Sequence, residues 1–206
     1  MGIKSLFTRH AKRPDGITGR LIAKMMWTKT KESNHWTVSL LNISPDDKIL
    51  EIGFGLGHTV KKLTEMAHMG FVGGIDISET MIDSATKLNF EEIEANQVEL
   101  KFGSVENIPF DNESFNKVFA INVIYLWADL HRSLSEIKRV LMRNGKVALY
   151  LADKKTMKMT DLESDVFTFY KPEDVKQALS GLEFQDIRIE HFSVLESSAT
   201  CVLARK

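Results

Sequence analysis

The sequence predicts a doubly wound α/β fold, in which a mostly parallel seven-stranded sheet ends in an antiparallel pair of strands. Short apolar runs alternate with helical patterns between residues 48 and 152. This alternation is typical of a parallel sheet that is covered by helices on both faces. Beyond residue 152 the pattern changes, because residues 184–192 and 199–206 are two strand patterns joined by a short turn. A turn of that length allows only antiparallel pairing.

The individual elements follow from apolar spacing and from turn residues. The predicted strands cover residues 48–52, 71–77, 98–104, 115–123, 146–152, 184–192 and 199–206. Helical periodicity predicts helices over about residues 57–68, from an N-cap at Ser78 to Leu88, and over 130–142, where Asn144-Gly145 provides the stop.

The first 44 residues predict two helices. Apolar side chains at helical spacing from Ile17 to Met26 indicate an amphipathic helix, and Asn34 is a suitable N-cap for a second helix that ends before the turn at Ser44. Residues 1–31 carry eight basic side chains against Asp15 alone, which gives this segment a charge of +7. We interpret the segment as a solvated helix that docks on the acidic remainder, with peripheral membrane contact through residues 1–31 as the alternative.

Composition excludes several functional classes. A chain of 206 residues with 43% hydrophobic and 27% charged residues is typical of one globular domain. The single cysteine, Cys201, excludes a disulfide framework, and no Cys/His spacing suggests a metal site. The formal net charge of −1 argues against nucleic-acid binding. We therefore expect a cytoplasmic protein without a metal, either a monomer or a homodimer.

The stretch LEIGFGLGHT, residues 50–59, places three glycines directly after the first predicted strand. A glycine turn at the carboxyl end of a strand commonly brings the backbone close to a ligand. His58 occupies the position of the third glycine in the dinucleotide fingerprint, and no Lys-Ser or Lys-Thr follows as in a P-loop. Glu51 beside the turn would repel a pyrophosphate and attract a cation. The turn therefore indicates a ligand that is at least partly positive.

Asp76 ends the second predicted strand at the same edge of the sheet. An ionised carboxylate there can accept hydrogen bonds from both hydroxyls of a ribose. Together with the glycine turn, Asp76 indicates a nucleoside site.

Four ordered segments, EIGFGLGHT, GIDIS, GSVENIPFDNESFNKVFAINVIYLW and RVLMRNGKVAL, carry a resemblance to a known family. The chain resembles the class I (Rossmann-like) S-adenosylmethionine-dependent methyltransferases, in the small-molecule branch that includes the ubiquinone-biosynthesis enzymes. The resemblance covers about residues 46–152. It implies a single methyltransferase domain over residues 1–206, with an N-terminal helical lid (1–44) over the cofactor edge, a cofactor-binding core (45–152), and an acceptor-side segment with the C-terminal strand pair (153–206).

The resemblance also implies S-adenosyl-L-methionine as cofactor and S-adenosyl-L-homocysteine as product. The glycines would admit the methionine part, Glu51 and the backbone near Asn122 would face its ammonium group, Asp76 would hold the ribose, and Ile77 and Val105 would enclose the adenine. The family usually has Asp where this chain has Ser104, so Ser104 or Glu106 would accept from the adenine amino group. Asn116 replaces a second frequent Asp. The expected cofactor-binding residues are Glu51, Gly53, Phe54, Gly55, Gly57, Asp76, Ile77, Ser104, Val105, Glu106 and Asn122.

Methyl transfer from a sulfonium is an in-line displacement, which requires alignment and exclusion of water more than a catalytic side chain. No catalytic residue is firmly assigned. The candidates are Tyr125, which is expected to project toward the methyl group, and His35, which could close over the cofactor. The aromatic stretch 167–170 and Met157 and Met159 are expected to cover a small-molecule acceptor that reacts through O, N or C.

Three alternatives remain at this stage. One is a catalytically degenerate S-adenosylmethionine-binding protein, which Ser104 and Asn116 would favour. Another is an enzyme that methylates a lipid-like acceptor at a membrane surface. A nicotinamide-dependent oxidoreductase is disfavoured by His58.

Overall fold

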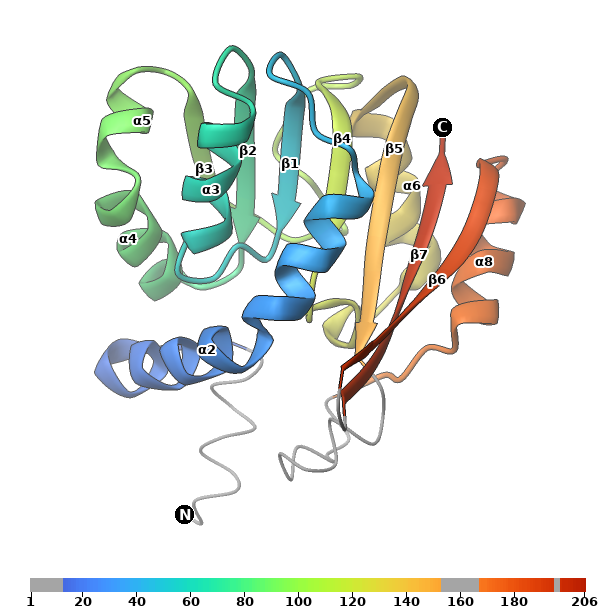
Figure 1. Ribbon diagram of the computed structural model, residues 1–206, viewed down its shortest axis with the longest axis horizontal. Coiled ribbons are helices and arrows are strands. Elements are labelled where there is room, and N and C mark those ends of the chain that lie inside the picture. Colours follow the sequence, from blue (N-terminus) through green and yellow to red (C-terminus); the bar gives the residue numbers. More distant parts are fainter. Residues whose placement is uncertain (1–12, 153–166, 195–196) are drawn as a thin grey trace.

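The computed structural model describes residues 13–152, 167–194 and 197–206, so Met157 and Met159 lie outside the described residues. It contains a seven-stranded sheet in the order β3-β2-β1-β4-β5-β7-β6 (Figure 1). The fold prediction is confirmed. The strands are β1 (Lys48–Ile52), β2 (Phe71–Asp76), β3 (Val98–Phe102), β4 (Phe115–Ala120), β5 (Leu141–Ala152), β6 (Gln185–Val194) and β7 (Ser197–Arg205).

The strand order places β1 between β2 and β4, in the parallel part of the sheet. β1 pairs in parallel with β2 on one side and with β4 on the other, so that Glu51 lies opposite both Gly74 and Phe119. From β1 the chain runs outward to β3, then returns to β4 on the other side of β1. A reversal of this kind leaves a crevice beyond the carboxyl ends of the two central strands. β6 and β7 pair antiparallel, as predicted for the two final strands, and β7 also pairs antiparallel with β5.

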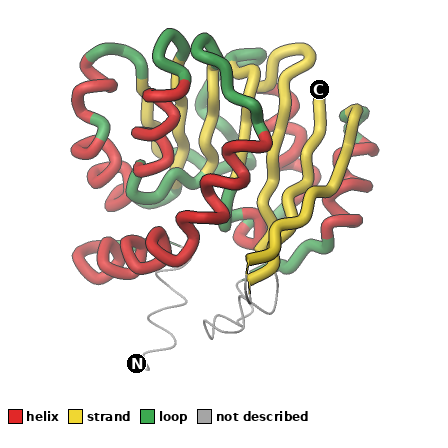
Figure 2. Tube along the Cα trace, in the orientation of Figure 1, coloured by secondary structure: helices red, strands yellow, loops and turns green. Residues whose placement is uncertain are grey.

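Helices cover the sheet on two faces, and each face has its own apolar core. α6 (Leu130–Val140) and α8 (Pro172–Gly181) pack on one face, where Leu134 and Leu179 are fully buried. α2 (Gly16–Leu40), α3 (His58–Met66) and α4 (Glu79–Leu88) cover the other face, with Leu63 and Ala85 fully buried. Figure 2 shows the strands as one layer between the two groups of helices. Within the described residues no helix is both long enough and apolar enough to cross a membrane.

The N-terminal helix corrects one prediction. Asn34 does not begin a second helix, because α2 is continuous from Gly16 to Leu40. Several hydroxyl side chains along α2 donate to the backbone of their own helix, as Thr30 Oγ1 does to the Met26 carbonyl at 3.0 Å and Thr37 Oγ1 to the Ser33 carbonyl at 2.9 Å. Such bonds satisfy polar groups without ending a helix and often bend it. Figures 1 and 2 show that α2 changes direction part-way along its length.

The helix α6 corrects a second prediction. The helix ends at Val140, and β5 begins at Leu141 rather than after Asn144-Gly145. Asn144 has a left-handed backbone (φ 61°), and its N–H donates to the Lys206 carbonyl at 3.1 Å. Asn144 therefore belongs to an irregular part of β5, where the register with β4 shifts. The short helix α5 (Phe90–Glu94) was not predicted.

Candidate active site

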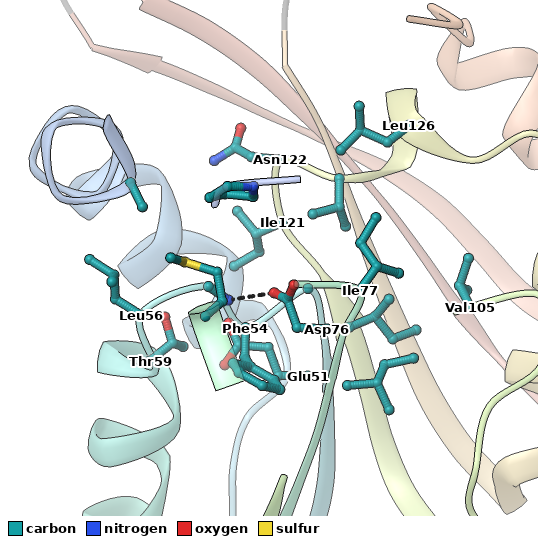
Figure 3. A pocket seen from close by; sticks show the side chains of 18 of the residues that line it. Glu51, Phe54, Leu56, Thr59, Asp76, Ile77, Val105, Ile121, Asn122 and Leu126 are labelled. Carbon is teal, nitrogen blue, oxygen red and sulfur yellow. Dashed lines mark hydrogen bonds between the residues drawn. The ribbon is translucent and has the colours of Figure 1, made fainter. Parts of the chain in front are cut away.

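A cavity of about 370 Å³ lies at the carboxyl edge of the sheet, between the strand ends and α2. The connections that follow β1, β2, β3 and β4 line it, as Figure 3 shows from close by. Ten of the eleven expected cofactor-binding residues are among its lining residues: Glu51, Gly53, Phe54, Gly55, Asp76, Ile77, Ser104, Val105, Glu106 and Asn122. The fold therefore brings together residues that are spread over 72 positions of sequence, from 51 to 122.

Two glycines shape the floor of the cavity. Gly53 and Gly55 have φ values of 76° and 56°, a region that side chains with a Cβ rarely adopt. A Cβ on Gly53 would lie 2.5 Å from Val123 Cγ1, whereas a Cβ on Gly55 would meet no protein atom within 4 Å. The first glycine is therefore required by packing inside the protein, and the second leaves open space.

The third glycine, Gly57, is not among the residues that line the cavity, and its expected role in admitting a ligand stays a prediction. It precedes the first turn of α3 with φ 80°, and a Cβ there would lie 2.6 Å from Ala85 Cβ. Its carbonyl accepts a hydrogen bond from Asn89 Nδ2 at 3.2 Å. Gly57 is therefore needed for the close packing of α3 against α4.

The Asp76 carboxylate is 8% exposed and is held by the backbone on both sides. Its Oδ2 accepts from the Gly55 N–H at 3.0 Å, and its Oδ1 accepts from the Ser78 N–H at 2.9 Å. Burial raises the pKa of Asp76, and these backbone donors oppose the rise. Because each oxygen has a second lone pair, the carboxylate can still accept two hydroxyl groups from the cavity.

Glu51 is the second acid of the cavity and is 5% exposed. Burial, and then the nearby Asp76, raise the pKa of Glu51 well above its ordinary value, while a hydrogen bond from Thr59 opposes the rise. Among the described residues its Oε2 has no hydrogen-bond partner. A buried, unpartnered carboxylate oxygen is costly unless a cationic group meets it, so this position suits an ammonium.

The connection after β3 provides Ser104, Val105 and Glu106. Ser104 Oγ accepts from the Glu106 N–H at 3.2 Å. Glu106 Oε1 accepts from the Asp129 N–H at 3.2 Å, so part of this carboxylate is used to hold the start of α6. Both side chains line the cavity, and both could accept from an amino group there.

Asn116 lies at the other end of the sheet, near the amino end of β4. Its Nδ2 donates to Asp47 Oδ1 at 2.7 Å, and its Oδ1 accepts from the Lys48 N–H at 2.8 Å. The neighbouring Lys117 is buried and pairs with Asp47 at 3.3 Å. Asn116 is therefore a structural residue, and its difference from the usual Asp does not bear on the cavity.

The two candidate catalytic residues do not line the cavity. The Tyr125 ring is buried against Phe167, with the ring centroids 5.6 Å apart, and burial raises its pKa. The 3-10 turn Ile124–Leu126 places Tyr125 in an apolar cluster rather than in the cavity, and its expected role near the methyl group stays a prediction. His35, on α2, is partly exposed, and burial and nearby lysines lower its pKa.

The structure adds residues that the sequence analysis missed. One face of α2 lines the cavity, and its residues are Ala23, Met26, Trp27, Thr30 and Asn34. The Trp27 ring stacks on His58 at 5.0 Å between centroids, with an interplanar angle of 23°. Burial, and then Lys24, lower the pKa of His58, so its imidazole is neutral near pH 7. The helical spacing of the α2 face could have indicated a buried stripe, but nothing in the sequence indicated its partner.

Within the described ranges no group of three or more acidic, histidine or cysteine side chains is placed to hold a metal ion.

Residues 50–149 match a family model described as a methyltransferase domain. The chain is also 28% identical to an uncharacterized methyltransferase of Bacillus subtilis (strain 168), YdaC, over 88% of this chain and 96% of the relative. These matches support a class I S-adenosylmethionine-dependent methyltransferase.

Two further comparisons agree with this assignment of the methyltransferase. A demethylmenaquinone methyltransferase of Thermotoga maritima is 28% identical, over 80% of this chain and 67% of the relative. Among solved structures, the methyltransferase in complex with the Trm112 activator of Haloferax volcanii superposes with a TM-score of 0.76. It has 16% sequence identity and covers 89% of this chain and 94% of its own, which shows a shared fold.

Proposed function

We propose that this methyltransferase transfers a methyl group from S-adenosylmethionine to a small-molecule acceptor in the cavity between the strand ends and α2. One observation carries the proposal. A backbone-held carboxylate, Asp76, a carboxylate oxygen without a partner, on Glu51, and open space at Gly55 meet in one cavity. These groups suit the ribose, the ammonium and the methionine chain of one amino-acid nucleoside.

The remaining lining residues support the same placement of the nucleoside in the cavity. Ile77 and Val105 offer apolar surface on either side of an adenine, with Ser104 or Glu106 as acceptors for its amino group. Bound S-adenosylmethionine would supply an electrophilic methyl group. The protein would align an acceptor O, N or C atom with that group and exclude water, and alignment alone can contribute about 7–11 kcal/mol.

The first test is binding of S-adenosylhomocysteine to the purified protein. A ligand that binds only the native state stabilises it by about 2.7 kcal/mol at a hundredfold excess over its dissociation constant. We expect a rise in Tm with S-adenosylhomocysteine and none with NAD, and loss of the rise in Asp76→Ala. A rise with NAD alone would overturn the proposal. Tight binding with no turnover over a broad acceptor panel would instead favour a catalytically degenerate binding protein.

A lipid-like acceptor at a membrane surface is the second candidate, because of the outer side of α2. Ile17 and Leu21 are 82% and 69% exposed, and Arg20 and Lys24 lie on the same helix. Apolar side chains beside basic ones favour an anionic lipid surface. The relative named for demethylmenaquinone gives further support for an apolar acceptor.

Co-sedimentation with phosphatidylglycerol vesicles tests the second candidate. Leu21→Glu should reduce the bound fraction, whereas Met69→Glu, which changes an equally exposed side chain away from α2, should not. Equal partitioning of the two variants would remove the idea. The cytoplasmic location stays a prediction.

A further inference from the structure

An amide without a hydrogen-bond partner lies in the wall of the cavity. Asn34 is 7% exposed, lines the cavity from α2, and its Oδ1 accepts no hydrogen bond from the described residues. A buried polar atom left without a partner costs about 1–3 kcal/mol. Among the residues that the structure describes, three other buried side-chain oxygens share this state, on Glu51, Asn89 and Glu92, and of these only Glu51 also lines the cavity.

Asn34 stands at one end of an otherwise apolar and aromatic wall. The wall residues are Ala23, Met26, Trp27, Thr30 and Asn34. Each lies three or four positions from at least one other, so they share one side of α2. The Thr30 hydroxyl already donates to the Met26 carbonyl at 3.0 Å. Trp27 is fixed by its stack on His58. Of the polar side chains in this wall, Asn34 is therefore the one whose oxygen accepts no hydrogen bond from the described residues.

The charges around the cavity limit what can bind beside this wall. The lining residues include the acids Glu51, Asp76 and Glu106 but, within the described part of the chain, no lysine or arginine. An anionic acceptor would therefore find no basic side chain among the described lining residues, and beyond the sulfonium of the cofactor nothing there would offset its desolvation, which costs several kcal/mol. A neutral molecule with an apolar body avoids that cost and can lie against Trp27.

We propose that Asn34 determines acceptor specificity: it accepts a hydrogen bond from a hydroxyl or N–H group of a neutral acceptor whose apolar or aromatic body lies against Trp27. This inference rests on the proposed function, since it assigns Glu51 and Asp76 to the cofactor and Asn34 to the second substrate. An acceptor that lacks the donor group leaves the amide oxygen unpaired, and such mismatches are the strongest source of discrimination against analogues. Asn34 positions the acceptor and takes no proton from it.

The test uses the protein saturated with S-adenosylhomocysteine and two matched probes, phenol and anisole. In anisole a methyl group replaces the hydroxyl hydrogen of phenol, so only phenol can donate a hydrogen bond. Binding is measured by ligand-detected NMR titration on the wild type and on Asn34→Leu, which keeps the branched shape of the side chain and removes the amide. We expect the wild-type complex to bind phenol at least tenfold more tightly than anisole. In Asn34→Leu the preference should fall below twofold through loss of phenol affinity, and Asn34→Ala should repeat the result.

Two controls separate this role from a structural one. Asn34→Leu should keep or raise Tm, because it removes an unpartnered polar atom. Asn89→Leu should lower Tm, because Asn89 Nδ2 donates to the Gly57 and Ala85 carbonyls at 3.2 and 2.8 Å, yet it should leave the phenol preference intact. The affinity for S-adenosylhomocysteine should stay within twofold in Asn34→Leu.

Several outcomes would overturn the inference. These are equal wild-type binding of phenol and anisole, binding of neither, or a preference that survives in Asn34→Leu. A large loss of S-adenosylhomocysteine affinity in Asn34→Leu would assign the amide to the nucleoside and also overturn it. Failure of the proposed function itself is distinguishable, because then the wild-type protein would not bind S-adenosylhomocysteine at all.

Discussion

Because the space beside Gly55 is open, two matched substitutions can distinguish the effect of backbone strain on stability from the effect of an obstructed cavity on ligand affinity. Gly55 and Gly16 have φ values of 56° and 59°, and a Cβ on either meets no protein atom within 4 Å. Gly55 lines the cavity, whereas Gly16, at the start of α2, does not. Alanine in the left-handed region costs about 1–2 kcal/mol, so both variants should lose that much stability. In a protein of this size the loss corresponds to a fall in Tm of about 2–8 °C.

The affinity for S-adenosylhomocysteine should divide the two variants. In Gly55→Ala the new methyl group occupies space that we assign to the methionine chain, and affinity should fall at least tenfold, about 1.4 kcal/mol. In Gly16→Ala affinity should stay within twofold of the wild type. Isothermal titration calorimetry at 25 °C, where both variants remain folded, measures the difference directly. If Gly55→Ala binds as well as Gly16→Ala, the ligand does not approach Gly55 and our placement of the methionine chain is wrong.

Three further predictions concern charge and packing. Because burial raises the pKa of Glu51, this group binds its proton more tightly in the folded state. The free energy of unfolding should therefore fall as pH rises from the unfolded pKa to the folded one, and Glu51→Gln should reduce that fall in urea titrations. Over the same pH window, the affinity of the wild type for S-adenosylhomocysteine should rise with pH. In Glu51→Gln the affinity should be lower and should depend less on pH. The same pH profile in both proteins would contradict the assignment of Glu51 to the ammonium group. Lys117→Met removes one partner of the buried pair with Asp47 and should cost about 3–5 kcal/mol in urea unfolding without altering ligand affinity once folded. Trp27→Ala should weaken phenol and anisole alike, and a selective loss of phenol would argue that Trp27, rather than Asn34, reads the hydroxyl.

Many of the residues that line the cavity could be predicted because each lies at the end of a strand's sequence or directly after the strand. Parallel strands bring their carboxyl ends to one edge, so Glu51, Asp76 and Ser104 had to lie near one another once the alternation was recognised. The same argument explains the error over Asn116. Asn116 is at the start of β4 and therefore at the amino edge of the sheet, whereas the cavity lies at the carboxyl edge.

The α2 side of the cavity could not be predicted in the same way, because it is formed by segments that are separate in the sequence and meet only in the folded protein. Trp27 and His58 are 31 positions apart in the sequence, and their stack depends on how α2 docks. The orientation of Tyr125 depends on a single 3-10 turn after β4, which apolar periodicity does not reveal.

Asn34 connects the main error in the fold prediction with the main inference about the acceptor. Asn is unfavourable inside a helix and favourable at an N-cap, so local preference predicts a break at Asn34. The structure instead buries Asn34 within α2 without a partner for its Oδ1. Neither the helix nor the core gains from an amide there, since an apolar side chain of the same volume would avoid the unpaired oxygen. A residue that is costly both locally and in the core is explained when a ligand supplies the missing hydrogen bond, and places where local rules fail are expected at functional sites. The cavity next to Asn34 is where that ligand can bind.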